Sequence, residues 1–211
     1  MGKNIIKAGF LAVLILSAGA VQAADTMKKG LETAIFAGGC FWCVEKDFDH
    51  VKGVVETTSG YTGGIILNPT YRQVTAGRSG HYEAVEIKYD PKVVTYKQLV
   101  EVFWRTVDPT DGGGQFCDRG QSYAPAIFAK SPEQQKIAEM SLAALKKSGV
   151  LKRPIRTPIL KAAKFYPAEG YHQNYYKKNP IRYGFYRQSC GRDARVKEVW
   201  GKQAYQGVDK K

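Results

Sequence analysis

Residues 35–48 read IFAGGCFWCVEKDF, an apolar run followed by a glycine pair and by two cysteines that flank Phe and Trp. The run Thr33–Ala37 predicts a short strand that ends at Gly38-Gly39. Apolar side chains then recur at the three- and four-residue spacing of one helix face, at Phe41, Val44, Phe48 and Val51. The stretch therefore predicts a strand, a tight turn and a helix, with Cys40 at the junction.

Further elements follow along the chain. Residues 95–107 predict a helix, because Thr95 and Gln98 have the spacing of a capping box. Residues 131–149 predict a second helix, with Ser131 as its cap and Gly149 as its end. Period-two patterns predict three strands, at residues 53–59, 81–90 and 126–129. Gly-rich composition predicts two long loops, at residues 60–80 and 108–123.

The last third of the chain has a weaker pattern. After residues 155–160 it becomes a basic, aromatic segment in which we expect one short helix, near residues 193–201. There is no internal repeat and no linker composition, so the sequence predicts a single α+β domain. Its two loops are long for a compact domain, and loops of that length tend to be functional.

The first 23 residues resemble a secretory signal peptide. Lys3 and Lys7 precede 14 residues that are apolar apart from one Ser, and the segment ends in VQA at Ala23. An apolar run of this length is too short to span the ~30 Å hydrocarbon core of a membrane. We therefore expect an exported protein, periplasmic or secreted, with no stable membrane anchor and a mature domain over residues 24–211.

Charge is the strongest compositional feature. Loss of residues 1–23, which hold two Lys and no acid, lowers the net charge from +13 to +11. From Lys146 onward there are 17 Lys or Arg and 4 Asp or Glu. We expect a solvated basic face that favours acidic partners or anionic surfaces, and no nucleic-acid partner, because no docking motif accompanies the charge.

Four cysteines in an exported chain often form two structural disulfides. Cys40 and Cys43 are too close in sequence to join distant parts of a fold, and a chain of this length does not need such links. We therefore expect reactive thiols. The free N–H groups and the dipole at a helix N-terminus favour a thiolate, which predicts a lowered pKa for Cys40.

The segment HYEAVEIKYD, residues 81–90, contains a carboxyl in an unusual position. Strand residues two apart share a face, so Glu83 lies on the same face as His81, Val85, Ile87 and Tyr89. We expect that face to pack on the core and the face with Ala84, Glu86 and Lys88 to meet water. A carboxyl on an apolar face has a raised pKa and can donate a proton, unless a buried Lys or Arg pairs with it.

A thiolate beside a neutral carboxylic acid suits a reaction that needs attack at an electrophilic atom and protonation of a leaving oxygen. Reduction of a sulfoxide is such a reaction. The thiolate attacks the sulfur, the acid protonates the oxygen, and the resulting sulfenic acid is cleared by a second thiol.

Six motifs carry a resemblance to a known family. GCFWCVE, GVVETTSGYTGG, NPTYRQV, GHYEAVEIKYDP, DRGQSYAPAIF and EGYHQNYYKKNP resemble, in order, the motifs of the peptide methionine sulfoxide reductase A family and cover nearly all of the mature chain. The resemblance implies a mixed sheet with a ferredoxin-like core, flanking helices and a coiled C-terminal tail. It also implies reduction of the S epimer of methionine sulfoxide, free or in proteins, and hence repair of oxidised exported proteins.

The same resemblance implies roles for individual residues. Cys40 is the nucleophile and Glu83 is the acid. Phe41 and Trp42 form an apolar wall for the substrate methyl group. Tyr71 and Tyr123 donate hydrogen bonds to the sulfoxide oxygen. Asp118 gives the site polar support, and His172 and Gln173 shape the rim of the pocket. Ala124-Pro125 replaces the Arg-Ser often found after the second tyrosine.

The thiol that resolves the Cys40 sulfenic acid stays open. Cys43 has the advantage of reach, because a CxxC pair at a helix start closes with little backbone movement. Cys190 lies in the tail, where many relatives keep a resolving cysteine, although its surroundings differ from theirs. Cys117 adjoins Asp118, and we expect it to be a buried thiol. The remaining route is direct reduction of the sulfenic acid by an exported thioredoxin-like dithiol.

We expect a thioredoxin-like dithiol as the electron donor and partner. We expect no bound cofactor, and we expect the protein to be a monomer.

Three other functions deserve comparison. A thiol–disulfide oxidoreductase would use Cys40 and Cys43 but give Glu83 no role. A metal site lacks a second cysteine pair, and the three His have no ligand spacing, so we expect no metal. A basic binding module without catalysis would leave Cys40 inert to alkylation at neutral pH.

Overall fold

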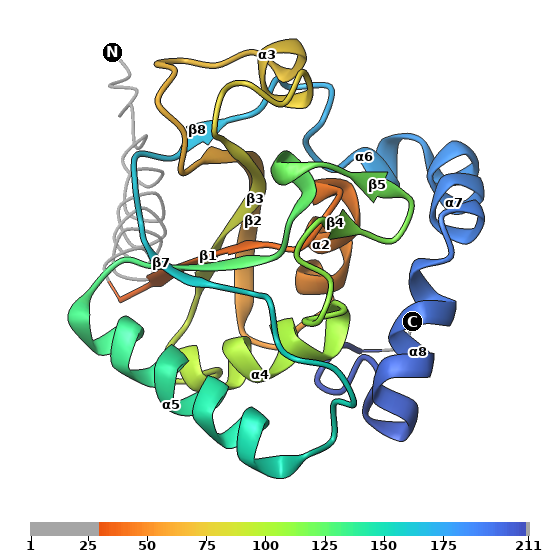
Figure 1. Ribbon diagram of the computed structural model, residues 1–211. Helices are drawn as coiled ribbons and strands as arrows, with labels where there is room; N and C mark the ends of the chain where they lie inside the picture. The colour runs from red at the N-terminus through yellow and green to blue at the C-terminus, as the bar shows by residue number, and fades with distance from the viewer. Residues whose placement is uncertain (1–29, 210–211) are drawn as a thin grey trace, which may run out of the picture. The chain divides into compact units, whose positions relative to one another are not determined.

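The computed structural model describes residues 30–209, and the expected signal peptide lies outside them. The main sheet has six strands in the order β7-β6-β1-β3-β2-β8 (Figure 1). Neighbouring strands are antiparallel except β6 and β7, which are parallel. The strands are β1 (Glu32–Ala37), β2 (Val54–Thr62), β3 (Tyr82–Tyr89), β6 (Ala126–Ala129), β7 (Ile159–Lys161) and β8 (Tyr166–Pro167).

Helices and a small ribbon complete the domain. The helices are α2 (Phe41–Asp49), α3 (Tyr71–Thr75), α4 (Tyr96–Thr106), α5 (Pro132–Ser148), α6 (Tyr175–Lys178), α7 (Pro180–Ser189) and α8 (Arg192–Trp200), with 3-10 turns η1 (Gln121–Tyr123) and η2 (Gly201–Gln203). Strands β4 (Gly114–Gln115) and β5 (Asp118–Arg119) form a separate antiparallel pair. The predicted single α+β domain with a mixed sheet is confirmed. No helix within residues 30–209 is long and apolar enough to cross a membrane.

Local sequence signals set the helix ends. Thr95 and Gln98 form the expected capping box at the start of α4. Ser131 caps α5, which ends at Gly149 in the left-handed conformation, φ 65°. These groups satisfy backbone N–H and C=O groups that a helix end leaves without partners.

The core lies mainly on one face of the sheet, against α2, α4, α5 and α8. Val85, Ile87 and Tyr89 of β3 are fully buried there, as the alternation predicts. The opposite face was expected to meet water, but Ala84 is also fully buried, in a second cluster with Ile35 and Phe128. The chain near Leu160 and Phe165 packs over that face, and the coil-like sequence there gave no sign of it.

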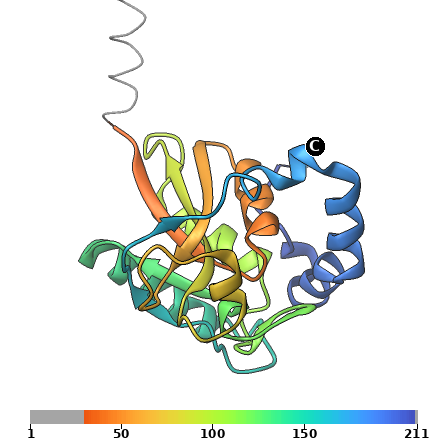
Figure 2. The same cartoon turned by 90° about the horizontal axis from the view of Figure 1, so that it is seen from above.

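Two regions contain more regular secondary structure than the sequence predicted. In the loop expected over 60–80, β2 continues to Thr62 and α3 begins at a capping box of Thr70 and Gln73. The expected coiled tail is wrong: α8 matches the predicted short helix, but α6 and α7 precede it (Figure 2). These two helices have buried aromatic faces, because Tyr175 and Tyr183 pack against Cys43 of α2. Their stabilising contacts are therefore tertiary, which a local pattern does not reveal.

Candidate active site

The turn between β1 and α2 places Cys40. Cys40 is the N-cap of α2 and is 7 % exposed. Gly39 has φ +85°, and a Cβ there would lie 2.7 Å from the Cβ of Gln115. Gln115 is fully buried and hydrogen bonds the backbone N–H and C=O of Asp108, so it cannot yield easily. Only glycine fits this turn without strain, which explains the glycine pair before the cysteine.

Cys40 and Cys43 are both free thiols and are hydrogen bonded to each other. Burial, followed by the contact with Cys43, raises the pKa of Cys40. Burial also acts on Cys43, but the hydrogen bond from Cys40 and the charges of Arg192 and Arg187 lower its pKa to about 7. The lowered pKa expected for Cys40 is therefore wrong for the reduced protein. Burial outweighs the helix N-terminus, and the pair carries its negative charge on Cys43.

Glu83 of β3 lies beside this turn. Its Oε2 accepts a hydrogen bond from the backbone N–H of Phe41 at 3.0 Å, and its Oε1 is buried without a partner among the described residues. Burial raises the pKa of Glu83 to about 8, against the lowering effect of the Phe41 N–H. The carboxyl is thus protonated at neutral pH and can donate, and no Lys or Arg of the described chain pairs with it.

Tyr71 and Tyr123 approach the carboxyl from two loops. Tyr71 is the first residue of α3, and Tyr123 ends η1. Burial, and then the nearby Glu83, raise the pKa of Tyr71 to about 12 and that of Tyr123 further. Both phenols therefore keep their protons and can donate hydrogen bonds beside Glu83.

Aromatic rings form one side of the site. Phe41 is 1 % exposed and packs on Tyr61, Tyr71 and His172. Trp42 is half-buried and stacks on Tyr175, with ring centroids 3.7 Å apart and planes inclined by 8°. Trp42 is thus held flat and keeps part of its surface free.

The EGYHQN motif supports this wall from behind. His172 is 1 % exposed, so it does not shape a rim as expected; its Nδ1 accepts a hydrogen bond from Trp42 Nε1 at 3.0 Å. Burial lowers the pKa of His172, so the ring is neutral. Gln173 accepts from the Ser59 N–H and donates to the Ser59 C=O, which fastens this segment to β2. Gln173 is half-buried, so its expected place at the pocket rim stays a prediction.

Glu169 was missed by sequence reasoning. One carboxylate oxygen accepts from the Tyr71 N–H at 2.9 Å, and the other accepts from the Tyr61 hydroxyl at 2.7 Å. It therefore fixes the start of α3 and, with it, Tyr71. The motif that contains Glu169 was recognised, but nothing in the local pattern assigned this residue a role.

Asp118 has an unexpected partner, Tyr186 of α7. The Tyr186 hydroxyl donates to Asp118 Oδ2, and its ring meets Trp42 edge-on at 5.8 Å. Burial raises the pKa of Cys40, and a hydrogen bond with Tyr186 opposes that shift in part. Burial raises the pKa of Asp118, and the Tyr186 hydrogen bond opposes the shift. Tyr186 thus connects the polar and the thiol sides of the site, and no periodic signal distinguished it from the other tail tyrosines.

Cys117 and Cys190 form a disulfide, with Cα atoms 4.9 Å apart and a sequence separation of 73. The expectation of a buried Cys117 thiol is wrong, because Cys117 is exposed and bonded. Cys40 and Cys43 are free thiols, whereas Cys117 and Cys190 form a disulfide, and the reactivity expected of the first pair stays a prediction. The bond fastens the loop that carries Asp118 to the end of the helix that carries Tyr186.

The structure thus brings together two thiols, a neutral carboxyl, two phenols and an aromatic wall, which suits attack on a polar group next to an apolar substituent. Cys117, Asp118 and Cys190 have ligand atoms within 4.8 Å of one another, but the two sulfurs are already bonded to each other. Thiolates, not disulfide sulfurs, are strong metal ligands.

Known proteins share this architecture. The chain is 53% identical over 174 residues to the peptide methionine sulfoxide reductase MsrA of Bacillus velezensis, covering 82% of this chain and 98% of the relative. It is 55% identical over 175 residues to MsrA 2 of Rhizobium meliloti, covering 83% and 86%. The solved structure of methionine sulfoxide reductase A of Corynebacterium diphtheriae superposes with a TM-score of 0.65 at 40% identity, covering 72% of this chain and 76% of that one.

The reduced form of Mxr1 from Saccharomyces cerevisiae also superposes with a TM-score of 0.65, at 31% identity and with 72% and 88% of the two chains covered. The family model described as peptide methionine sulfoxide reductase matches residues 32–204, which includes every site residue named above. The chain therefore belongs to the peptide methionine sulfoxide reductase family.

Proposed function

We propose that this chain reduces the S epimer of methionine sulfoxide, free or within polypeptides, with Cys40 as nucleophile and Glu83 as general acid. The observation that carries the proposal is the 3.0 Å hydrogen bond from the Phe41 N–H to Glu83. It holds a protonated carboxyl beside the residue that follows Cys40. Attack and protonation can then occur on the same S=O group.

In the first step the Cys40 Sγ attacks the sulfoxide sulfur and its proton passes to Cys43. Glu83 protonates the sulfoxide oxygen and the S–O bond breaks. The hydroxyl then bonds to Cys40 Sγ as the bond between Cys40 Sγ and the substrate sulfur breaks, with its electron pair returning to the substrate sulfur. Methionine leaves in its reduced form, and Cys40 becomes a sulfenic acid. The two electrons that reduce the substrate come from the Cys40 sulfur.

Selectivity for one epimer needs separate places for the methyl group and the oxygen. Tyr71 and Tyr123 would hold the oxygen next to Glu83, whereas Phe41 and Trp42 would receive the methyl group. The opposite epimer exchanges these substituents, which places an unbonded oxygen against aromatic rings.

Cys43 is the resolving thiol that we favour. It is free and hydrogen bonded to Cys40, whereas Cys190 is already bonded to Cys117. Attack of Cys43 on the sulfenic acid forms a Cys40–Cys43 disulfide and releases water. A thioredoxin-like dithiol would then reduce this disulfide, so the cycle needs no bound cofactor.

The physiological role that we propose is repair of oxidised exported proteins. It rests on residues 1–23, which have the charged, apolar and small-residue regions of a signal peptide. Amino-terminal sequencing of the protein recovered from the periplasm or medium should begin at Ala24. Recovery of full-length chain from the cytoplasm alone would contradict this localisation.

The activity is tested with the two sulfoxide epimers of N-acetylmethionine and a small dithiol as reductant. We expect methionine formation from the S epimer alone and none with Cys40→Ser. Ser cannot form the sulfenic acid, so that variant controls for reduction by the dithiol itself. Equal turnover of the R epimer, or no turnover of either, would refute the proposal.

A further inference from the structure

Two arginines of the C-terminal segment are buried beside α2. Arg187 of α7 is 7 % exposed and Arg192 of α8 is 1 % exposed. Asp47 of α2 lies between them, with Oδ1 2.8 Å from Arg187 Nη1 and Oδ2 3.6 Å from Arg192 Nε. Asp47 follows Cys43 by four residues, so its side chain lies on the same face of α2 as that thiol.

Arg192 reaches the turn that carries Cys40. Its Nη1 donates to the Gly38 C=O and its Nη2 to the Thr106 C=O, both at 2.9 Å. Its Nε has no hydrogen-bond partner among the described residues. Two neutral carbonyls do not cancel a positive charge, and the carboxylate that pairs with Arg192 among the described residues, Asp47, is shared with Arg187. Arg192 therefore leaves positive charge beneath the N-terminus of α2.

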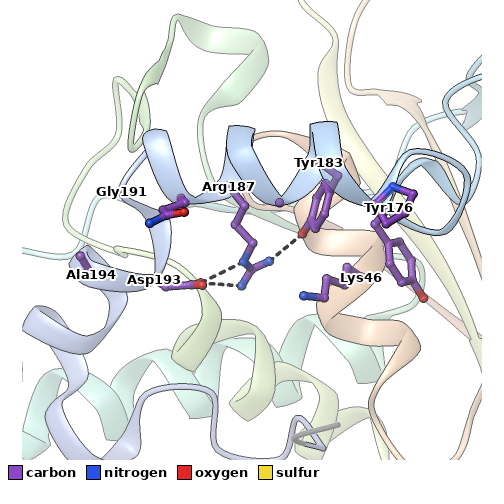
Figure 3. Close-up of a pocket in the computed structure, with 10 residues that line it drawn as sticks. Lys46, Tyr176, Tyr183, Arg187, Gly191, Asp193 and Ala194 are labelled. Carbon is purple, nitrogen blue, oxygen red and sulfur yellow. Dashed lines mark hydrogen bonds and ion pairs between the residues drawn. The ribbon is translucent and has the colours of Figure 1, made fainter.

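Arg187 of α7 also lies near enough to Cys43 for its charge to act on that thiol. Its Nη1 contacts the Tyr183 hydroxyl at 3.0 Å, and the Tyr183 ring packs against Cys43. Figure 3 shows Arg187 between Tyr183 and Asp193, in a pocket beside α7. Asp193 pairs with the guanidinium at 2.7 Å, but its side chain is 48% exposed, so water screens its charge.

Groups from four elements surround Cys43. The neutral or proton-bearing groups are Cys40, Glu83 of β3 and the phenols Tyr183 and Tyr186 of α7. The charged groups are the two arginines and Asp47. Cys43 is 2 % exposed, and burial alone would keep its proton in place. The excess of buried positive charge opposes that effect.

We propose that Arg187 and Arg192 are positioning residues for the second half of the reaction: their buried guanidinium groups prepare Cys43 to attack the Cys40 sulfenic acid. The inference rests on the proposed function. In the step, Cys43 Sγ forms a bond to Cys40 Sγ and the Cys40 S–O bond breaks. The proton that Cys43 releases leaves with the hydroxyl as water, and the electrons of the new bond come from Cys43.

The pKa of about 7 for Cys43 agrees with this geometry, since the charges of Arg192 and Arg187 lower it. If the pKa returned to its ordinary value of 9.0, the thiolate fraction at pH 7 would fall about fifty-fold. Loss of one arginine should produce part of that change. It should also slow methionine formation, because the Cys43 thiolate accepts the Cys40 proton in the first step, so the second step is followed as the disulfide formed per methionine released.

The test is a single turnover of reduced enzyme with substrate, quenched at intervals between pH 6 and 10. Methionine and the Cys40–Cys43 disulfide are measured separately in each sample by mass spectrometry. The variants are Arg187→Met, Arg192→Met and the charge-retaining Arg187→Lys and Arg192→Lys. Arg195→Met is the matched control, because Arg195 is on α8 but pairs with Asp108 and Glu198, away from the thiols.

We expect both Met variants to form the disulfide between three and fifty times more slowly at pH 7 and to approach the original rate near pH 10. The Lys variants should recover most of the rate, and Arg195→Met should not change it. Asp47→Asn removes the opposing anion, so it should accelerate disulfide formation at pH 6, an effect that mere structural damage would not produce.

A uniform loss of rate at every pH, or an unchanged pH profile in both Met variants, would overturn the inference. If a Met variant does not fold, Asp47→Asn alone tests the inference. Slower disulfide formation in Asp47→Asn at pH 6 would then contradict it. Methionine formed without any Cys40–Cys43 disulfide would refute this inference but leave the proposed activity intact. No methionine at all from wild-type enzyme would refute the proposed function instead.

Discussion

Tyr186 donates its hydroxyl hydrogen to Asp118, 68 residues earlier in the chain, and also contacts the thiol of Cys40. Tyr186→Phe removes both hydrogen bonds but keeps the ring against Trp42. Each such bond is worth about 0.5–1.5 kcal/mol, so loss of the two together should lower kcat/KM by about fivefold to 150-fold. Tyr176→Phe is the control, because that hydroxyl binds Asp49 away from the site. Equal losses in the two variants would show that Tyr186 has no special role.

Glu83→Gln tests the general acid. The variant keeps the shape of the side chain but cannot donate a proton to the leaving oxygen, so methionine formation in one turnover should slow by about 10²–10⁴. Substrate binding should change less, since Tyr71 and Tyr123 remain. Stopped-flow or quenched-flow measurement of methionine separates the two effects. Full activity of Glu83→Gln would assign that carboxyl a structural role.

The pH dependence should be bell-shaped. Activity should rise as the cysteine pair loses a proton, with the pKa of Cys43 at about 7, and fall as Glu83 loses its proton at about 8. Glu83→Gln should lack the falling limb while keeping the rising one. A falling limb that persists in that variant would assign it to another group.

The same carboxyl links stability to pH. Folding raises the pKa of Glu83 from 4.5 to about 8, so the folded protein binds this proton more tightly than the unfolded chain. Its contribution to stability is complete below pH 4.5 and is lost as the pH rises through about 8. Chemical denaturation at several pH values should show a smaller loss of stability in Glu83→Gln than in wild type. Parallel curves would indicate that the carboxyl is not buried as described.

Parts of the site that depend on neighbouring residues followed from the sequence. The Gly-Gly-Cys turn, the capping box of α4 and the face on which Glu83 lies all reflect local backbone periods and steric limits. The resemblance to a family added Tyr71, Tyr123 and Asp118. The catalytic roles of these three residues stay predictions.

Contacts between distant segments could not be predicted from the sequence. Glu169, Tyr186 and the two buried arginines act on residues about 70 to 154 positions away, and their sequence surroundings look like an ordinary basic surface. The pairing of Cys117 with Cys190 was equally hidden, because four cysteines allow several pairings and spacing does not choose among them. Such contacts are fixed only when the tail packs on α2.

Removal of that disulfide should separate stability from catalysis. The bond closes a loop of 73 residues, so Cys117→Ser with Cys190→Ser should lower the free energy of unfolding by about 4 kcal/mol. Turnover with a small dithiol at 25 °C should persist if Cys43 resolves the sulfenic acid. Urea denaturation and the N-acetylmethionine sulfoxide assay measure the two effects. Complete loss of multiple turnover in a folded double variant would reassign resolution to Cys190.

The turn before Cys40 provides the sharpest test of the local geometry. Gly39→Ala would force an L residue to φ +85° and place its Cβ 2.7 Å from the Gln115 side chain. The left-handed conformation costs about 1–2 kcal/mol, and overpacking at a rigid buried contact costs about 1–3 kcal/mol more.

We therefore expect Gly39→Ala to lower the free energy of unfolding by about 2–5 kcal/mol and to displace Cys40 enough to reduce kcat. Gly184→Ala is the matched control: Gly184 lies within α7, and a Cβ there meets no atom within 4 Å. Alanine is the better helix former, so that variant should gain about 0.5–1 kcal/mol. Thermal and urea unfolding of both variants measure the difference. An unchanged free energy of unfolding in Gly39→Ala would mean that the turn relaxes despite its close contact with Gln115.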